Sequence, residues 1–226
     1  MTKNGIDKDY KLFQGAEDYV HDLMRSFRIW GEFRKGFNAL RKVENCVTIF
    51  GSARLTPDNP YYQMAYDTAY LLGQNGRSIM TGGGPGIMAA ANKGAKDAGA
   101  LSIGCSIKLP HESPNPYTDI NINFDHFFVR KVMLLKYSSA FILLPGGLGT
   151  MDEAFELATL MNTKKIGQFP FILMGQAYWR ELRPFINCTM IKNGTLSEHE
   201  LGNAIITDDP KIALDIITDK RMYDTI

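Results

Sequence analysis

Apolar residues between positions 16 and 40 recur in steps of three and four along the chain. This spacing is the period of an amphipathic helix, so we predict one long helix, or two shorter ones broken at Gly31 or Gly36. A stripe of this kind packs on its own domain or forms an interface with another subunit. We therefore assign residues 1–44 to an N-terminal helical extension, and we expect its apolar face to be covered by its own domain or by another subunit.

From position 46 onward, short runs of β-branched and apolar residues alternate with stretches of helical period. The pattern predicts strands at residues 46–50, 78–80, 101–107, 120–124, 140–144, 169–174 and 204–207, and helices at residues 61–74, 85–97, 129–137, 150–161, 178–185 and 210–217. Alternating strands and helices imply right-handed crossovers and a mostly parallel sheet with helices on both faces. We expect residues 45–226 to form one Rossmann-like, doubly wound α/β domain.

The overall charge is nearly balanced, which limits the classes of partner. The chain of 226 residues carries 25 Lys plus Arg and 24 Asp plus Glu, a net charge of +1. A field this weak does not favour a general binder of nucleic acid or of acidic membranes, so any anion site must be local. The first residues are polar, and the apolar runs are far shorter than the ~18 residues of a membrane span. We expect a soluble, cytoplasmic protein with no nucleic-acid and no membrane partner.

The sequence indicates neither a metal site nor a serine nucleophile. Cys46, Cys105 and Cys188 lack the short paired spacing of a zinc site or a redox dithiol, so we expect all three to be buried structural thiols. The histidines show no metal-ligand spacing, and no Gly-x-Ser-x-Gly motif occurs.

Glycine-rich turns follow three of the predicted strands. Residues 50–54 read Phe-Gly-Ser-Ala-Arg, residues 81–86 read Thr-Gly-Gly-Gly-Pro-Gly and residues 145–150 read Pro-Gly-Gly-Leu-Gly-Thr. One such turn alone is often only a tight connection, but parallel strands end at one edge of the sheet, so we expect the three turns to meet there. Pro85 fits the first position of a helix and would direct the N–H groups of the second turn toward an anion, while Thr150 can add a hydroxyl in the third. The expected ligand is an anion of the size of phosphate.

Two widespread phosphate motifs give weaker indications. The P-loop pattern ending in Gly-Lys-Ser/Thr is absent, which argues against the usual ATPase or GTPase. The dinucleotide fingerprint is matched only in relaxed form, at residues 84–89 after the second predicted strand. An NAD-linked oxidoreductase is therefore an alternative that rests on this match alone.

Charged residues flank the third turn. Asp152, Glu153 and Glu156 follow it, and Arg130 and Lys131 lie on the helix that leads into its strand. Acids at the start of a helix can simply interact with the helix dipole, and a basic pair can simply face solvent. Taken together, a carboxylate and a guanidinium beside a bound phosphate indicate chemistry on a phosphorylated sugar.

These motifs resemble those of the LOG family, named after the plant protein Lonely Guy and long mislabelled as lysine decarboxylases. The resemblance rests on Phe50-Gly-Ser-Ala-Arg54, Thr81-Gly-Gly-Gly-Pro-Gly-Ile-Met88 with Ala90-Ala-Asn92, Arg130-Lys131 and Pro145-Gly-Gly-Leu-Gly-Thr-Met-Asp-Glu153. It runs in order from about Val47 to Trp179, and the N-terminal extension is similar to that of the longer bacterial members. It implies a phosphoribohydrolase that cleaves the N-glycosidic bond of a nucleoside 5′-monophosphate, either AMP or a cytokinin riboside 5′-monophosphate. The products would be the free base and ribose 5-phosphate, with no metal, PLP or other cofactor.

The resemblance also assigns site residues, with Arg130 and Glu153 as the catalytic pair. It assigns nucleotide binding to Ser52, Gly83, Gly84, Lys131, Gly146, Gly147, Gly149 and Thr150, with Glu112 and Thr159 as further binding positions. The chain departs from the longer members at Ala89, where they commonly have Glu, so base and sugar selectivity stay open. The family further implies a homodimer or an assembly of dimers.

The chemistry explains why these residue types are needed. Losing a base builds positive charge on the ribose, as in the oxocarbenium-like state of glycosidases, and a carboxylate such as Glu153 stabilises that charge. Glu153 can also orient or deprotonate the attacking water, and Arg130 can position the nucleotide or assist the departing base. A non-catalytic nucleotide sensor or carrier of the same fold is the competing hypothesis, and the presence of both Arg130 and Glu153 argues against it.

Overall fold

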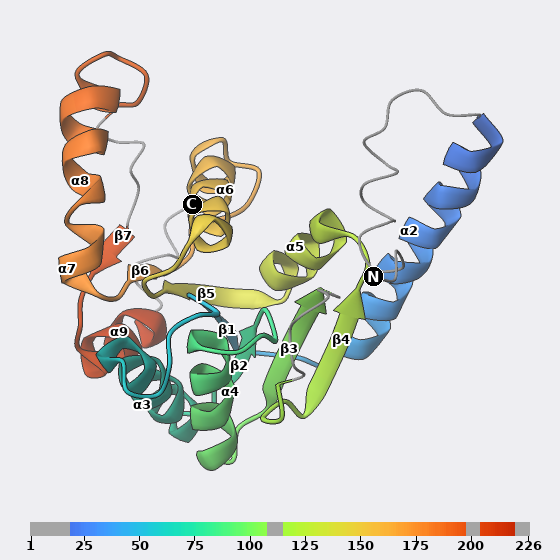
Figure 1. Ribbon diagram of the computed structural model, residues 1–226, viewed down its shortest axis with the longest axis horizontal. Coiled ribbons are helices and arrows are strands. Elements are labelled where there is room, and N and C mark those ends of the chain that lie inside the picture. Colours follow the sequence, from blue (N-terminus) through green and yellow to red (C-terminus); the bar gives the residue numbers. More distant parts are fainter. Residues whose placement is uncertain (1–18, 108–114, 198–203, 220–226) are drawn as a thin grey trace.

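Seven short segments of the chain form one parallel sheet in the computed structural model, which describes residues 19–107, 115–197 and 204–219 (Figure 1). The strands are β1 (Cys46–Phe50), β2 (Ser78–Thr81), β3 (Ser102–Ile107), β4 (Ile120–Phe124), β5 (Ser138–Leu143), β6 (Phe171–Leu173) and β7 (Ala204–Ile206). Their order across the sheet is β4-β3-β2-β1-β5-β6-β7, and every neighbouring pair is parallel. This confirms the doubly wound, Rossmann-like α/β fold that the alternation of elements predicted.

Helices cover both faces of the sheet (Figure 1). They are α2 (Tyr19–Leu40), α3 (Pro60–Gln74), α4 (Ile87–Asp97), α5 (Phe127–Lys136), α6 (Leu148–Asn162), α7 (Gln176–Trp179), α8 (Leu182–Pro184), the π-helix η1 (Phe185–Ile191) and α9 (Pro210–Thr218). Helices α3, α4 and α9 lie on one face, α5 and α6 lie on the other, and α2 runs beside β4 and α5. Within the described ranges, no helix is long and apolar enough to cross a membrane.

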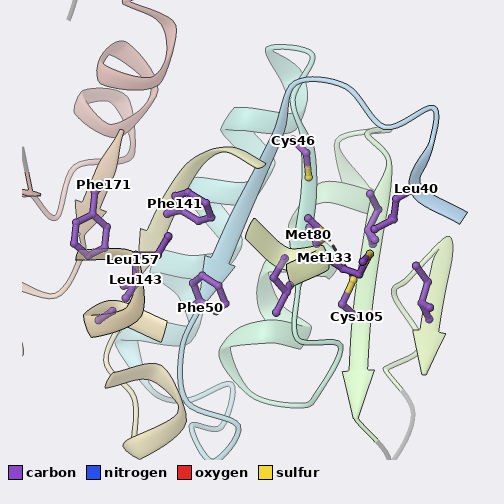
Figure 2. Close-up of a cluster of buried hydrophobic side chains, with 14 of the residues drawn as sticks. Leu40, Cys46, Phe50, Met80, Cys105, Met133, Phe141, Leu143, Leu157 and Phe171 are labelled. Atoms are coloured by element: carbon purple, nitrogen blue, oxygen red, sulfur yellow. Dashed lines mark hydrogen bonds between the residues drawn. The ribbon is translucent and has the colours of Figure 1, made fainter. Parts of the chain in front are cut away.

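Two apolar clusters, one on each face, form the core. Side chains alternate along β1, so Cys46 and Phe50 belong to the cluster under α5 and α6, whereas Val47 and Ile49 belong to the cluster with α3 and α4. Figure 2 shows the first cluster, in which Leu157 of α6 lies over the strands. Both faces of the sheet are covered by apolar side chains and helices, as a parallel sheet requires.

Two of the three cysteines are structural thiols. Cys46 and Cys105 are buried, and burial raises the pKa of both thiols, that of Cys105 to about 12, so both stay protonated. Cys188 is exposed because it lies on η1, a helix with no buried residue. The expectation that all three cysteines are buried is therefore wrong for Cys188.

Helix α2 is continuous through both of its glycines. A Cβ atom at Gly36 would lie 2.6 Å from Met133 Sδ and 3.3 Å from the ring of Phe124, so the missing side chain allows α2 to approach β4 and α5 closely. Gly31 has no atom within 4 Å of the equivalent position. Of the two sequence alternatives, the single long helix is the one that forms, and the boundary predicted at residue 44 falls between its end and β1.

The helix after β2 begins two residues later than expected. Its N-cap is Gly86, which has a positive φ of 66°, and the helix starts at Ile87 instead of Pro85. The N–H of Ile87 donates to the carbonyl of Ser52 at 2.9 Å, so this helix start is tied to the turn after β1. The prediction that Pro85 occupies the first helical position is wrong. The turn needs a positive φ at position 86, a conformation that only glycine adopts easily, and the helix begins after it.

The helix expected at residues 178–185 is also different. The chain forms α7 from Gln176, whose N–H and that of Gly175 both donate to Asp208 Oδ1. After Pro184 the chain continues as the π-helix η1. Proline has no N–H to donate to the carbonyl four residues earlier, which favours a change of helix type at that point.

Candidate active site

The strand order reverses between β1 and β5, which creates a crevice at the carboxyl ends of these two strands. The chain runs from β1 outward to β4 and then returns to the other side of β1 at β5. Backbone hydrogen bonds hold the two following turns together, from Ser52 N–H to Pro145 O at 3.1 Å and from Leu144 N–H to Phe50 O at 2.9 Å. The first and third glycine turns therefore lie side by side.

A cleft of about 580 Å³ opens at this point, a size suited to a small-molecule ligand. Its lining comes from all three glycine turns, from α4 and α5, and from the first two turns of α6. The lining residues are Phe50, Gly51, Ser52, Ala53, Arg54, Gly82, Met88, Arg130, Gly147, Leu148, Gly149, Thr150 and Glu153. The expectation that the three turns meet at one edge of the sheet is thus confirmed.

Arg130 of α5 and Glu153 of α6 meet inside the cleft. Arg130 Nη2 donates to Glu153 Oε1 at 3.3 Å, and the two side chains are only 16% and 3% exposed. Within the described part of the chain, Arg130 Nε and Glu153 Oε2 are buried without a hydrogen-bond partner. Buried polar atoms normally find partners, so these two are the atoms that a ligand or a water would satisfy.

Gly82 makes room for this pair. A Cβ atom there would lie 3.2 Å from Arg130 Nη1 and 2.8 Å from Met88 Sδ. The glycine of the second turn therefore allows the guanidinium to reach the cleft.

The environment of Glu153 leaves its carboxyl group partly protonated and partly ionised at neutral pH. Burial raises the pKa of Glu153 to about 7, and the nearby positive charges of Arg130 and Lys131 oppose this rise. A carboxyl group with a pKa near the working pH is suited to exchange protons during a reaction. Such a shift beside a specific charge partner, in a cleft, is typical of functional sites.

The N-terminus of α6 faces the same cleft. Its N-cap is Gly147, which has no side chain to cap the helix, and the first intrahelical bond runs from Met151 N–H to Gly147 O at 3.1 Å. The N–H groups of Leu148, Gly149 and Thr150 precede that bond, so they have no acceptor within the helix. Backbone N–H groups together with the helix dipole form an anion site.

The second glycine turn contributes less than the sequence suggested. Gly83 and Gly84 are buried, and of this turn only Gly82 lines the cleft. The N–H of Gly83 donates to Thr81 Oγ1 at 2.9 Å, so it serves the turn itself. A binding role for Gly83 and Gly84 stays a prediction.

Lys131 lies beside the cleft and not among its lining residues. Its ammonium is 2.8 Å from Asp152 Oδ2 and 2.9 Å from Glu156 Oε2. Burial acts to lower the pKa of Lys131, but the hydrogen bonds to these two carboxylates outweigh it and leave the pKa above its usual value. In this arrangement the positive charge of Lys131 offsets the negative charges of Asp152 and Glu156, which lie on α6 next to Glu153.

Three other predicted binding residues lie outside the cleft or outside the described residues. Gly146 accepts a hydrogen bond from Tyr178 Oη at 2.6 Å through its carbonyl. Thr159 is exposed farther along α6, where its hydroxyl donates to the carbonyl of Phe155. Glu112 is not among the described residues.

Some cleft residues were not singled out as binding residues from the sequence. Arg54 was noted only as part of a motif, although its place in the first glycine turn is a usable signal. Phe50 and Met88 offer apolar surface to a ligand, and only the fold shows that they share this cleft. No three His, Cys, Asp or Glu side chains gather as a metal site would need, as far as the chain is described.

Comparison with known proteins identifies relatives. A family model described as "Possible lysine decarboxylase" matches residues 88–217. An uncharacterized protein of Archaeoglobus fulgidus is 35% identical over 98 residues, which are 42% of this chain and 63% of that protein. The cytokinin riboside 5′-monophosphate phosphoribohydrolase of Rhodococcoides fascians is 24% identical over 174 residues, 75% of this chain and 87% of that enzyme.

A third relative is the pyrimidine/purine nucleotide 5′-monophosphate nucleosidase of Escherichia coli, which is 29% identical over 164 residues. The match covers 66% of this chain but only 36% of that enzyme.

Solved structures share the fold. The molybdenum cofactor carrier protein of Chlamydomonas reinhardtii superposes with a TM-score of 0.56 at 22% identity, over 78% of this chain and 99% of that one. The molybdenum cofactor binding protein of Rippkaea orientalis gives a TM-score of 0.54 at 26% identity, over 76% and 93% of the two chains.

Proposed function

The chain belongs to the LOG family, whose model carries the description "Possible lysine decarboxylase", and from this membership we propose that it hydrolyses nucleoside 5′-monophosphates. The bond cleaved is the N-glycosidic bond of AMP or of a cytokinin riboside 5′-monophosphate. The observation that carries the proposal is the buried Arg130–Glu153 pair, which faces the cleft beside the open N-terminus of α6. The relatives named as a phosphoribohydrolase and a nucleosidase support the same reaction class.

The geometry supports binding of two groups of the substrate, the phosphate and the ribose, at neighbouring positions of α6. The 5′-phosphate would bind the N–H groups at Gly149 and Thr150, where the dipole of α6 favours an anion. Glu153 follows Thr150 by three residues and so lies within one turn on the same helix. Binding energy from the phosphate, which does not react, can then hold the ribose against the carboxylate.

The chemistry follows from the charge that develops when the bond breaks. As the base leaves C1′, the ribose gains positive charge, and the Glu153 carboxylate stabilises it. Water then forms the new bond to C1′ and gives up a proton, which reaches the nitrogen of the departing base either directly or by way of Glu153 Oε2. Arg130 holds Glu153 through Oε1 and has Nε left for the nucleotide. The net reaction consumes one water and releases a free base and ribose 5-phosphate.

A panel of nucleoside 5′-monophosphates tests the proposal, with free base and ribose 5-phosphate measured by chromatography. The wild-type protein should release base from at least one of them. Glu153→Gln and Arg130→Ala should each lower turnover by about a hundredfold or more, since each removes stabilisation that is specific to the transition state. Asp152→Asn is the matched control, because Asp152 precedes Glu153, is exposed and lies outside the cleft lining.

Two results would contradict the proposal. One is the absence of base release from every nucleotide of the panel. The other is near wild-type turnover by Glu153→Gln, which would remove that residue from the mechanism.

A non-catalytic carrier or sensor is the second candidate function, because the molybdenum cofactor binding protein of Rippkaea orientalis has the same fold at 26% identity. In that case the cleft would bind a phosphorylated ligand and release it unchanged. Recovery of intact AMP from a stoichiometric complex after prolonged incubation would favour the carrier. The presence of both Arg130 and Glu153 in the cleft favours the hydrolase.

A further inference from the structure

Helix α2 binds the junction between β4 and α5, the helix that carries Arg130 (Figure 1). Glu32 Oε2 accepts hydrogen bonds from the N–H groups of Asp125 at 3.1 Å and His126 at 3.3 Å. Glu32 Oε1 lies 2.9 Å from His126 Nδ1. The side chain of Glu32 is only 14% exposed and that of His126 only 3%, so these contacts are shielded from solvent.

This contact supplies what the start of α5 lacks in its own sequence. The N-cap of α5 is His126, whose side chain makes no capping hydrogen bond, and two phenylalanines follow it. The first N–H groups of a helix have no partner within the helix, and a carboxylate near them is favoured by the helix dipole. Glu32 satisfies one of these groups, the N–H of the N-cap residue His126, and so takes the part of the glutamate of a capping box from 94 positions away in the sequence.

The capped turn is the turn that leads to Arg130. The N–H of Arg130 donates to the carbonyl of His126 at 3.3 Å, so the residue that Glu32 binds also begins the hydrogen bonding of α5. The guanidinium of Arg130 lies 5.3 Å over the ring of Phe127, in the same turn. Any change in the position of this turn moves Arg130 relative to Glu153, which it contacts at 3.3 Å.

We propose that Glu32 is a positioning residue, which caps α5 and thereby holds Arg130 against Glu153. The inference rests on the hydrolysis proposed above for its kinetic test. It makes the N-terminal helix part of the catalytic apparatus, although none of the described residues of α2 lines the cleft. Hydrogen bonds to a charged group are stronger than those between neutral groups, so the Glu32 carboxylate is suited to fix the first turn of a helix.

Lys35 provides a matched control on the same helix. Its ammonium donates to the carbonyl of Asn123 at 2.9 Å, so it also anchors α2 near the end of β4. This hydrogen bond does not involve the first turn of α5, so its removal leaves the contacts of Glu32 in place. If α2 only stabilised the fold, loss of the Lys35 contact should lower activity as much as loss of the Glu32 contact.

The kinetic test compares Glu32→Ala, Glu32→Gln and Lys35→Ala with AMP as the substrate. Glu32→Ala should lower kcat at least about tenfold and change KM by less than about twofold, since the phosphate binds α6 and not α5. Glu32→Gln keeps an oxygen acceptor for the two N–H groups and should recover kcat to within about threefold of wild type. Lys35→Ala should keep the wild-type kcat.

Three results would overturn the proposal: wild-type kcat in Glu32→Ala, an equal loss of kcat in Lys35→Ala, or no recovery in Glu32→Gln. If Glu32→Ala does not fold, Glu32→Asp replaces it, because a side chain shorter by one methylene cannot reach both N–H groups in the same way. Glu32→Asp should then lower kcat, and a wild-type kcat in that variant would equally overturn the proposal.

Amide hydrogen exchange without any nucleotide separates this proposal from the proposed function. Glu32→Ala should exchange faster than wild type at Asp125 and His126 and through to Arg130, whereas Lys35→Ala should not. Unchanged exchange in Glu32→Ala would overturn the cap. If the wild-type protein releases no base from any nucleotide, the proposed function is contradicted. The exchange measurement still tests whether Glu32 caps α5, because it needs no nucleotide.

Discussion

At the scale of single residues, Glu153 is the group whose properties the fold changes most. Its carboxyl group is 3% exposed, and burial raises its pKa to about 7 despite the opposing charges of Arg130 and Lys131. A protonated carboxyl group cannot stabilise a developing positive charge, so only the ionised form is active in the proposed mechanism. The fold thus determines the pH at which the residue functions.

We therefore expect kcat/KM for AMP to rise with pH through an inflection near 7, because the ionised fraction of Glu153 in the free enzyme rises over that range. Below the inflection, kcat/KM should fall about tenfold for each unit of pH. A profile measured with AMP from about pH 5 to about pH 9 checks this. A profile that falls through this region would mean that the protonated form is the active one.

Lys131→Met extends the same prediction to a neighbouring charge. Lys131 lowers the pKa of Glu153, so its loss should move the inflection to higher pH. The sequence assigned Lys131 to nucleotide binding, whereas its ammonium is bound by Asp152 and Glu156. A large rise in KM with an unchanged pH profile would indicate that Lys131 binds the nucleotide directly, and it would contradict the arrangement described.

Gly147→Val tests the anion site without changing any charge. No atom lies within 4 Å of a Cβ placed at Gly147, and its φ of −90° suits any residue, so the variant should fold normally. The added side chain stands at the end of α6 that is proposed to hold the phosphate. We expect AMP binding, measured by calorimetry, to weaken by about a hundredfold or more.

Gly167→Val is the matched control for that variant, since the nearest atom to a Cβ at Gly167 is Phe169 Cε2 at 4.0 Å and the residue lies outside the cleft lining. It should bind AMP as the wild type does. Unchanged AMP affinity in Gly147→Val would show that the phosphate binds elsewhere.

At the scale of elements, the periodicity of the sequence predicted most strands and helices because each period reflects which faces are buried. The predictions from periodicity fail where tertiary contacts determine where an element begins or ends. The start of α4 depends on Gly86 and on the bond from Ile87 to Ser52, which joins two turns far apart in the sequence. Gly36 of α2 leaves room for the close approach of Met133, which no local pattern reveals.

The two glycines of α2 give a prediction about stability. Gly31→Ala should raise the free energy of unfolding by about 1 kcal/mol, because alanine is the better helix former and the position is open. Gly36→Ala gains the same propensity but must displace the buried Met133, and overpacking costs about 1–3 kcal/mol. Urea denaturation should therefore find Gly36→Ala less stable than Gly31→Ala by about this amount. Equal stabilisation of both variants would refute the tight packing at Gly36.

At the scale of the whole molecule, the parts of the candidate site and its Arg130–Glu153 pair were predictable, whereas the other long-range pairings were not. The motifs located the three turns, and the parallel sheet brought them to one edge. The binding of Lys131 by α6 and the contact between Glu32 and α5 are long-range contacts. A single sequence carries no signal for which distant charged residues will pair.

The exposed apolar surface predicts self-association. On α2, Tyr19 is 77% exposed, Phe27 is 65% exposed and Trp30 is 59% exposed, and Phe127 and Phe128 of α5 are also exposed. Large apolar patches of this kind mark protein interfaces, so we expect a homodimer or an assembly of dimers. Light scattering should give at least twice the chain mass of 25.3 kDa. A mass near 25.3 kDa at micromolar concentration would contradict this expectation.

The most direct test of the central claim is kcat/KM for base release from AMP and from adenosine, measured side by side on the wild-type protein. If the N-terminus of α6 holds the 5′-phosphate and so places the ribose at Glu153, AMP should yield adenine and ribose 5-phosphate. Adenosine should then react at least about a hundredfold more slowly, because it lacks the group whose binding energy orients the ribose. Comparable values for the two substrates, or no adenine from AMP, would contradict the account.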